Sequence, residues 1–199
     1  MVGMLVWAAA GCSSVVEGAA EPASGQEGLF DPCKDIPDSV LEEVGLDPAT
    51  EEVDIAGVEQ PGWKICSWTQ SGYYVIVFSG ENSLDDAKAN ASFTGFETLS
   101  IGGRPALRFH SASDPDIDRC YVGLDVSLGS IWIAADAKNS QQQEDSMCSI
   151  ASRYAEALEG ALPRCQWPRS SPRRRPVVLP AGGHGFSPVA ASCFSPPAF

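Results

Sequence analysis

Basic residues are scarce in this chain, with 13 Lys and Arg side chains against 26 Asp and Glu side chains among 199 residues. The resulting formal charge of -13 excludes the broad Lys/Arg surface that binds nucleic-acid phosphates. It also excludes a polybasic contact with a membrane surface. Hydrophobic residues make up 44% of the chain, so it can still build a folded core.

Long apolar runs and close cysteine pairs are missing as well. No stretch of about eighteen apolar residues occurs, which predicts that the mature protein has no membrane-spanning helix. The seven cysteines include no Cys-x-x-Cys pair, the close spacing that zinc sites need, and we expect no metal or other cofactor. Seven cysteines are many for a cytosolic chain of this length and indicate an oxidising compartment.

Residues 1–12 predict a lipoprotein signal. The segment before Gly11 is mostly apolar, which fits the hydrophobic part of a secretory signal and is too short to span a bilayer. Ala9-Ala10-Gly11-Cys12 resembles a bacterial lipobox, in which the chain is cut before a cysteine that carries a diacylglycerol. Leu is usual where Ala9 stands, and the basic residues of a signal are missing, so we interpret the signal as truncated. The alternative is a chance Gly-Cys pair behind a core helix.

Two further segments have the composition of unfolded chain. Residues 13–28 are rich in Gly, Ala, Ser and Glu, which is typical of a flexible tether. Residues 164–199 contain five arginines and no Asp or Glu, so the chain before them carries a formal charge of -18 from 8 basic and 26 acidic residues. We expect a Pro/Arg-rich disordered tail there. It is either a basic segment that touches acidic polymers or a frameshifted end, and we favour the second interpretation.

Residues 29–163 show the periodicities of a folded domain. Helical spacing or capping residues predict helices over 37–45, 83–91 and 145–162, with Ser83 as the N-cap of the second. Alternating or β-branched runs and Gly-containing turns predict seven strands, over 53–56, 63–69, 73–79, 96–101, 104–110, 120–128 and 131–137. The order is helix, three strands, helix, four strands, helix.

This order predicts one α+β domain with an antiparallel sheet and packed helices. Each connection between consecutive strands reads as a hairpin or a short turn, and no long linker divides the segment. A PsbP/Mog1-like α/β/α sandwich has a similar order of helices and strands. That likeness is an analogy between folds and carries no function.

Candidate chemistry in this domain is sparse. His110 can be drawn as a triad with Ser111 and Asp114 or Asp116, but no Gly-x-Ser-x-Gly elbow supports a nucleophile. Asp114, Asp116 and Asp118 have the spacing that opens a calcium loop, yet the Gly and Glu that such a loop needs are absent. We therefore predict no catalytic residues and no metal site.

Aromatic side chains form the more interesting set. Trp63, Trp68, Tyr73, Tyr74 and Trp132 lie on predicted strands, where about half of the side chains face a core. The others could line a shallow face for a lipid, a glycan or a protein. The alternative is a well-packed sheet with ordinary surface aromatics.

A known family matches several of these features. Phe30-Asp31-Pro32-Cys33 precedes a short helix that ends near Gly45, and Cys66-Ser67-Trp68 follows on a strand. This arrangement resembles an actinobacterial lipoprotein family of uncharacterised function, whose members carry a lipobox, a tether and a later cysteine pair. The resemblance covers residues 29–163 and implies a surface-anchored envelope protein. It brings no catalytic residues, and the tail departs from its pattern.

The order of motifs in that family implies two disulfides. Cys33 would pair with Cys66, and Cys120 with Cys148. Four cysteines allow three pairings, so this choice depends on the resemblance and not on spacing. Each bond would close a loop of about thirty residues and contribute about 3–4 kcal/mol in the chain-entropy model.

These observations define one expected function and two alternatives. We expect a lipoprotein on the outer face of the plasma membrane, anchored through Cys12, whose domain acts as a non-catalytic binding or accessory module of the cell envelope. Its partners would be the membrane, through the lipid, and an envelope protein, lipid or glycan, but no nucleic acid. The alternatives are a carrier that encloses a lipid or glycolipid tail, and an envelope hydrolase.

Overall fold

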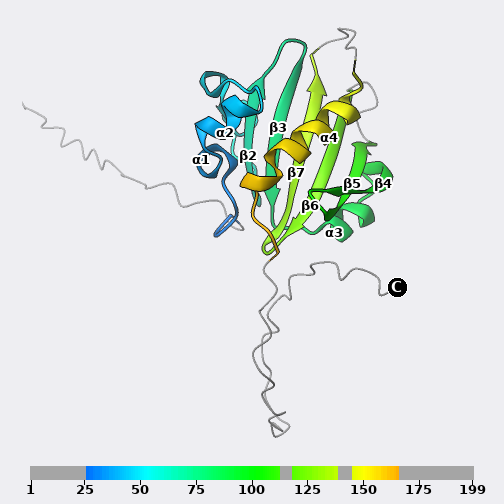
Figure 1. Ribbon diagram of the computed structural model, residues 1–199. Helices are drawn as coiled ribbons and strands as arrows, with labels where there is room; N and C mark the ends of the chain where they lie inside the picture. The colour runs from blue at the N-terminus through cyan, green and yellow to red at the C-terminus, as the bar shows by residue number, and fades with distance from the viewer. Residues whose placement is uncertain (1–25, 113–117, 139–144, 166–199) are drawn as a thin grey trace, which may run out of the picture.

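The computed structural model describes residues 26–112, 118–138 and 145–165. These residues form one seven-stranded sheet in which all neighbouring strands are antiparallel, with the order β1-β2-β3-β7-β6-β5-β4 (Figure 1). The strands are β1 Glu52–Val53, β2 Trp63–Thr69, β3 Tyr73–Gly80, β4 Phe93–Ile101, β5 Arg104–Ser111, β6 Arg119–Val126 and β7 Gly129–Ala137.

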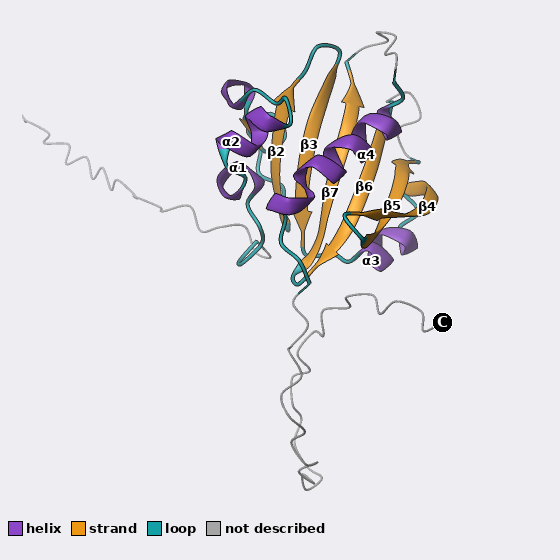
Figure 2. Ribbon diagram, viewed as in Figure 1, coloured by secondary structure: helices purple, strands orange, loops and turns teal. Residues whose placement is uncertain are grey.

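The helices occur where the sequence predicts them. They are α1 Pro32–Asp35, α2 Asp38–Glu43, α3 Leu84–Ala89 and α4 Met147–Leu158, with short 3-10 turns at Pro48–Thr50 and Glu159–Ala161. The predicted α+β class and the antiparallel sheet are confirmed. Helices pack on both faces, with α4 crossing one face and α3 lying at the other (Figure 2). The four-residue helix α1 is an addition to the predicted elements.

Alternation along the strands separates two cores. On one side, which we call the α4 face, side chains such as Cys66, Val75, Val122 and Ile133 pack beneath α1, α2 and α4. On the other side, the aromatic face, ring-bearing residues pack together with α3; they are Trp63, Phe78, Phe93, Phe96, Phe109, Tyr121 and Trp132. The sheet is therefore buried on both faces, which explains why β7 is apolar at nearly every position.

Helix α3 connects β3 to β4, and hydrogen bonds at its N-cap hold its first turn in place. The Ser83 hydroxyl accepts a hydrogen bond from the backbone N–H of Asp86 (3.2 Å), and the Asp86 carboxylate accepts one from the Ser83 N–H (2.9 Å). The predicted N-cap at Ser83 is confirmed. The Leu84 N–H also donates to the Asp125 carboxylate of β6 (2.9 Å), which attaches the start of α3 to the sheet.

Helix α4 is shorter than predicted. Its apolar stripe, including Ile150, Tyr154 and Leu158, is buried against the sheet as the helical spacing indicates. The α-helix ends at Leu158 rather than Leu162, and the chain continues as a 3-10 turn through Gly160, a residue that disfavours helix. In this turn the buried Glu159 carboxylate lies near Arg104 of β5, 3.5 Å away, so the turn is held against the β4–β5 hairpin.

Strand β4 curls over the aromatic face. Its Phe93 ring lies 5.2 Å from that of Trp132 in β7, although β7 is three strands away, or about 14 Å across a flat sheet. A bulge between Thr94 and Glu97, with Gly95 at a φ of 67°, produces this bend. The strand begins three residues before the predicted residue 96, because the bulge interrupts its alternation.

The tight turn between β6 and β7 generates a test of the fold. Gly129 has a φ of 87°, and a Cβ there would lie 2.0 Å from the carbonyl oxygen of Gly80. We expect Gly129→Ala to lower the free energy of unfolding by about 3 kcal/mol or more, measured by urea denaturation. Gly103→Ala is the matched control, since Gly103 has a φ of 80° but nothing within 4 Å of its Cβ position. It should cost only about 1 kcal/mol, and equal losses would contradict the steric argument.

Candidate functional site

The first disulfide attaches the N-terminal helices to the edge of the sheet. Cys33 of α1 is bonded to Cys66 of β2, with their Cα atoms 5.3 Å apart, which confirms the predicted pair. Cys66 is fully buried on the α4 face, and Cys33 is half-buried. The bond therefore holds α1 over β2, where Trp68 completes the core beneath it.

The second disulfide attaches α4 to the middle of the same face. Cys120 of β6 is bonded to Cys148, the second residue of α4, and this predicted pair is also confirmed. Cys120 is fully buried, whereas Cys148 is partly exposed. Each of the two helical layers over the α4 face is thus covalently bonded to one strand beneath it.

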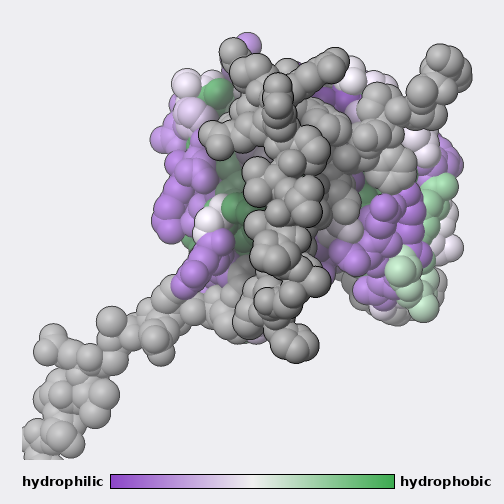
Figure 3. All heavy atoms as spheres, turned by 90° about the horizontal axis from the view of Figure 1, so that it is seen from below, coloured by the Kyte–Doolittle hydropathy of each residue, from purple (hydrophilic) through white to green (hydrophobic). Residues whose placement is uncertain are grey.

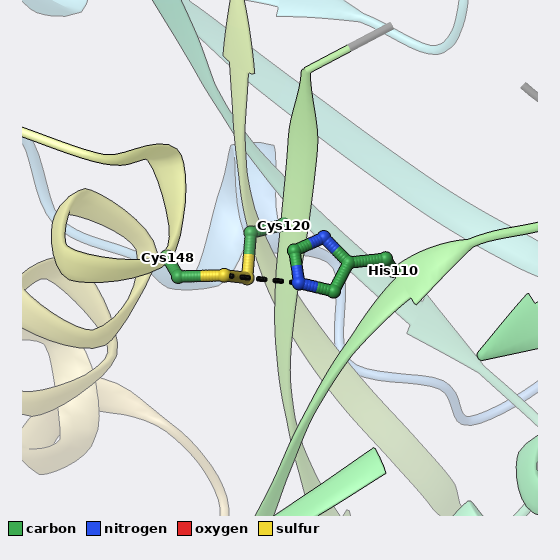
Figure 4. Close-up of side chains that lie close together, drawn as sticks. All are labelled: His110, Cys120 and Cys148. Carbon is green, nitrogen blue, oxygen red and sulfur yellow. Dashed lines mark hydrogen bonds between the residues drawn. A yellow bond between two sulfur atoms is a disulfide. The ribbon is translucent and has the colours of Figure 1, made fainter. Parts of the chain in front are cut away.

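His110 lies directly beside the second disulfide. The register of β5 with β6 places His110 opposite Cys120, and the imidazole Nε2 is 3.4 Å from the Cys148 Sγ (Figure 4). The other ring nitrogen, Nδ1, donates to the backbone carbonyl of Arg119 at 3.3 Å. Three elements, β5, β6 and α4, therefore bring an imidazole and a sulfur pair together.

Ser111, the hydroxyl partner that the sequence offers His110, is not at this site. Ser111 is the next residue of β5, and it pairs with Phe93 of β4, on the side of the sheet opposite His110. Asp114 and Asp116 lie outside the described residues, as does most of the Asp114–Asp118 segment considered for calcium. Within the described part of the chain, the side chain that the His110 Nε2 contacts is that of Cys148, through its sulfur.

Two groups of side chains have their potential ligand atoms within 4.8 Å of one another. One is His110 with Cys120 and Cys148, and the other is Glu51 with Cys33 and Cys66. Burial raises the pKa of the Glu51 carboxyl. In both groups the sulfur atoms form a disulfide, and metal binding needs thiolates. While the disulfides are intact, the first group can offer a metal only the His110 imidazole, and the second only the Glu51 carboxylate.

The five aromatic residues considered for a ligand face lie on both sides of the sheet. Trp68 and Tyr73 lie on the α4 face, where Trp68 is 0% exposed and the Tyr73 hydroxyl is 3.4 Å from that of Tyr154. Trp63 and Trp132 belong to the aromatic face, and Tyr74 points to the same side from β3. Tyr73 and Tyr74 are neighbours in one strand, so their side chains point to opposite faces of the sheet.

The aromatic face is packed rather than hollow. The Trp63 and Trp132 ring centroids are 4.8 Å apart, and Phe109 stacks on Tyr121 at 5.1 Å. Trp132 is 5% exposed and also donates from its indole N–H to the Ser130 hydroxyl, 2.8 Å away. Phe93, Phe96, Phe109 and Tyr121 were not singled out from the sequence, although alternation along β5 and β6 could have placed the last two. Of the five predicted residues, Tyr74 is the most exposed, at 38%.

Both ends of the described domain meet at the β6–β7 turn. A Cβ on Gly28 would lie 3.3 Å from the Leu128 side chain, and the Ser127 hydroxyl donates to the Arg164 carbonyl at 3.2 Å. The two chain ends leave the domain on this side (Figure 1). Cys12, the predicted lipidation site, lies outside the described residues. Among the residues that the structure describes, no helix is long and apolar enough to cross a membrane.

Comparison with known proteins places the chain in a family. Residues 7–161 match the family described as "Protein of unknown function (DUF3558)", and the chain belongs to it. No curated protein and no solved structure matches the chain. The matched range includes Cys12 and all four cysteines of the two disulfides.

The disulfides generate a prediction about stability. Their sequence separations of 33 and 28 residues are nearly equal, so the chain-entropy model assigns about 3–4 kcal/mol to each. We expect the double variants Cys33→Ala/Cys66→Ala and Cys120→Ala/Cys148→Ala each to lower the free energy of unfolding by about this amount in urea denaturation. A loss below about 1 kcal/mol for either variant would show that its bond does not constrain the unfolded chain.

Proposed function

We propose that this chain is a lipid-anchored protein on the outer face of the plasma membrane, attached through Cys12, and that its domain is a binding or accessory module of the cell envelope. The observation that carries the proposal is the pair of disulfides. Stable structural disulfides form in oxidising compartments and are rare in the cytosol. A chain whose described residues include the bonds Cys33–Cys66 and Cys120–Cys148 behind a lipobox-like Ala9-Ala10-Gly11-Cys12 has the features of an exported lipoprotein.

The geometry of the N-terminal end supports an anchor on that side. The Gln26 side-chain amide donates to the backbone carbonyls of Gln60 (3.0 Å) and Trp63 (2.8 Å), so the described chain begins at a fixed point of the domain. Thirteen residues lie between Cys12 and Gln26. If flexible, they would span about 20 Å on average, which would keep the domain close to the bilayer.

The surface of the domain at that side also agrees with attachment through a lipid rather than through the domain itself. Seen from below, the described surface that is visible on either side of the grey atoms is mostly hydrophilic, with separate hydrophobic areas (Figure 3). An acidic protein with such a surface has little affinity of its own for an anionic bilayer. The diacylglycerol would therefore supply the membrane binding, and the domain would remain available to a partner in the envelope.

The packing weighs against the two alternative functions. A lipid carrier needs an enclosed apolar space, whereas the rings of the aromatic face fill the region between the sheet and the curled β4. A serine hydrolase needs a histidine against a hydroxyl, whereas His110 lies against the Cys148 sulfur. We therefore favour an envelope protein or glycan as the partner of the module.

The anchor is tested by the mass of the full-length protein made in an actinobacterial host. We expect detergent-extracted protein to have lost residues 1–11 and to carry a diacylglycerol on Cys12, and to partition into the detergent phase of Triton X-114. Cys12→Ala should leave the signal uncleaved and the lipid absent. Ser14→Ala, two residues away, is the matched control and should behave as the parent protein. An unmodified parent chain would remove the anchor from the proposal.

The carrier alternative is tested on the same purified protein. Native mass spectrometry should show the domain without a co-purified lipid, apart from the covalent diacylglycerol. A stoichiometric non-covalent lipid that survives purification would favour the carrier over the binding module.

A further inference from the structure

The two disulfides have different surroundings, and the difference is chemical. Cys148 is the second residue of the twelve-residue helix α4, whose N-cap is Ser146. The backbone N–H groups at a helix N-terminus stabilise a negative charge, and a thiolate there is favoured over a thiol. Cys148 is partly exposed, whereas its partner Cys120 is fully buried. An external thiol can therefore reach one sulfur of the pair far more easily than the other.

The second observation is the orientation of His110. Its Nδ1 lies 3.3 Å from the Arg119 carbonyl oxygen, which can only accept, so Nδ1 carries a proton. In the neutral imidazole this leaves Nε2 with a lone pair that faces the Cys148 sulfur at 3.4 Å. A disulfide sulfur has no proton to give to that lone pair. A Cys148 thiol has one, so the arrangement becomes a proton-transfer pair only after reduction.

We propose that Cys120, Cys148 and His110 form a thiol–disulfide exchange site for a dithiol or disulfide of another envelope protein. Cys148 is the cysteine that exchanges with the substrate, and Cys120 is the buried cysteine that resolves the mixed disulfide. His110 receives the proton of the Cys148 thiol. This activity goes beyond the binding function proposed above and does not depend on the identity of that partner.

The exchange balances without a further reagent. A thiolate of the substrate dithiol attacks the Cys148 Sγ, the bond between Cys148 and Cys120 breaks, and Cys120 leaves with the electron pair and takes up a proton. The second substrate thiol gives its proton to His110 and attacks the substrate sulfur of the mixed disulfide, which releases Cys148 as a thiolate beside the protonated imidazole. The two protons of the substrate dithiol thus end on Cys120 and His110. The substrate is oxidised to a disulfide by two electrons, and the protein pair is reduced by two. The reverse sequence reduces a substrate disulfide.

The Cys33–Cys66 pair also joins a half-buried cysteine to a fully buried one, but it lacks the long helix and the imidazole, so it serves as an internal reference. Helix α1 has only four residues, and the ionisable side chain grouped with this pair, within 4.8 Å, is the Glu51 carboxyl and not an imidazole. A carboxylate disfavours a second negative charge beside it, so reduction of Cys33–Cys66 to a thiolate is opposed. We assign this bond a structural role.

Three arginines on the described parts of β5, β6 and α4 belong to ion pairs. On β5, Arg108 pairs with Glu97 of β4, and on β6, Arg119 pairs with Asp136 of β7 on the opposite side of the sheet from Cys120, where it also contacts Tyr121. At α4, Arg153 pairs with Asp145, 3.2 Å away. These cations each have their own carboxylate, and the basic side chain seen in contact with the sulfur pair is His110.

The site also lies toward the end of the domain away from the anchor side. Cys120 precedes Val126, the last residue of β6, by six residues, which is about 20 Å along a strand. Both described chain ends are at the β6–β7 turn beyond Val126. A substrate protein would therefore approach from the side opposite the attachment.

The first experiment compares the two pairs in the full-length protein. The chain is equilibrated in glutathione buffers of stepped composition, the free thiols are alkylated, and the occupancy of each pair is read from its peptides by mass spectrometry. We expect Cys120–Cys148 to be half reduced at a ratio of reduced to oxidised glutathione that is at least about tenfold lower than the ratio needed for Cys33–Cys66. A parallel series with a thioredoxin protein as the reductant should be faster than glutathione at the same thiol concentration if the substrate is a protein dithiol.

The second experiment separates proton transfer from a structural role of His110. In the selectively reduced protein, Cys148 should still react with iodoacetamide at about pH 6, where an ordinary thiol is almost wholly protonated. His110→Gln should slow this reaction about tenfold at about pH 6 and leave it unchanged near pH 9. Arg153→Gln is the matched control, because it removes an exposed charge of α4 without touching the sulfur pair. It should leave both rates unchanged.

Three outcomes would overturn the proposal. One is reduction of both pairs at the same buffer ratio. Another is a His110→Gln protein that alkylates like its parent at about pH 6 while remaining folded by circular dichroism. The third is reduction of Cys120–Cys148 only together with loss of the folded signal, which would make the bond structural like its neighbour. None of these results bears on the lipid anchor, which is tested through Cys12.

Discussion

The pairing of β6 between β5 and β7 is the interaction on which both sides of this protein depend. Cys120 of β6 points toward α4, and Tyr121, the next residue, points into the aromatic rings. A slip of one residue in this strand would exchange the two faces, taking Cys120 away from Cys148 and Tyr121 away from Phe109. The register with β7 runs without interruption from Arg119 to Val126, so the disulfide and the aromatic packing reinforce the same alignment.

The strongest local signals in the sequence led to the correct elements. Strand β3 is almost wholly β-branched or aromatic, Ser83 begins a capped helix, and α4 keeps its apolar residues at helical spacing, so each could be predicted from its own residues. Both disulfide pairs also proved correct, although they were chosen from the order of motifs in a family. Spacing alone would have left three pairings, because the distance between two cysteines depends on how the strands are ordered in the sheet.

What could not be predicted depends on contacts between elements that are distant in the chain. The contact of His110 with Cys148 joins residues 38 apart and requires both the β5–β6 register and the placement of α4. The curl of β4 depends on a bulge at Gly95, which hides the strand's alternation in the sequence. The aromatic residues were grouped by type, and the structure separates Tyr73 from Tyr74 because successive residues of a strand face opposite sides.

The position of the first disulfide has a mechanical consequence for a domain held by its N-terminal end. A pulling force transmitted along the chain would first break the two hydrogen bonds of the Gln26 side chain. Only seven further residues could then be drawn out before the force reached Cys33, an extension of about 25 Å. Beyond that point the load passes through a covalent bond into β2, in the body of the sheet. The fold is thus protected against being unravelled from the end by which it would be tethered.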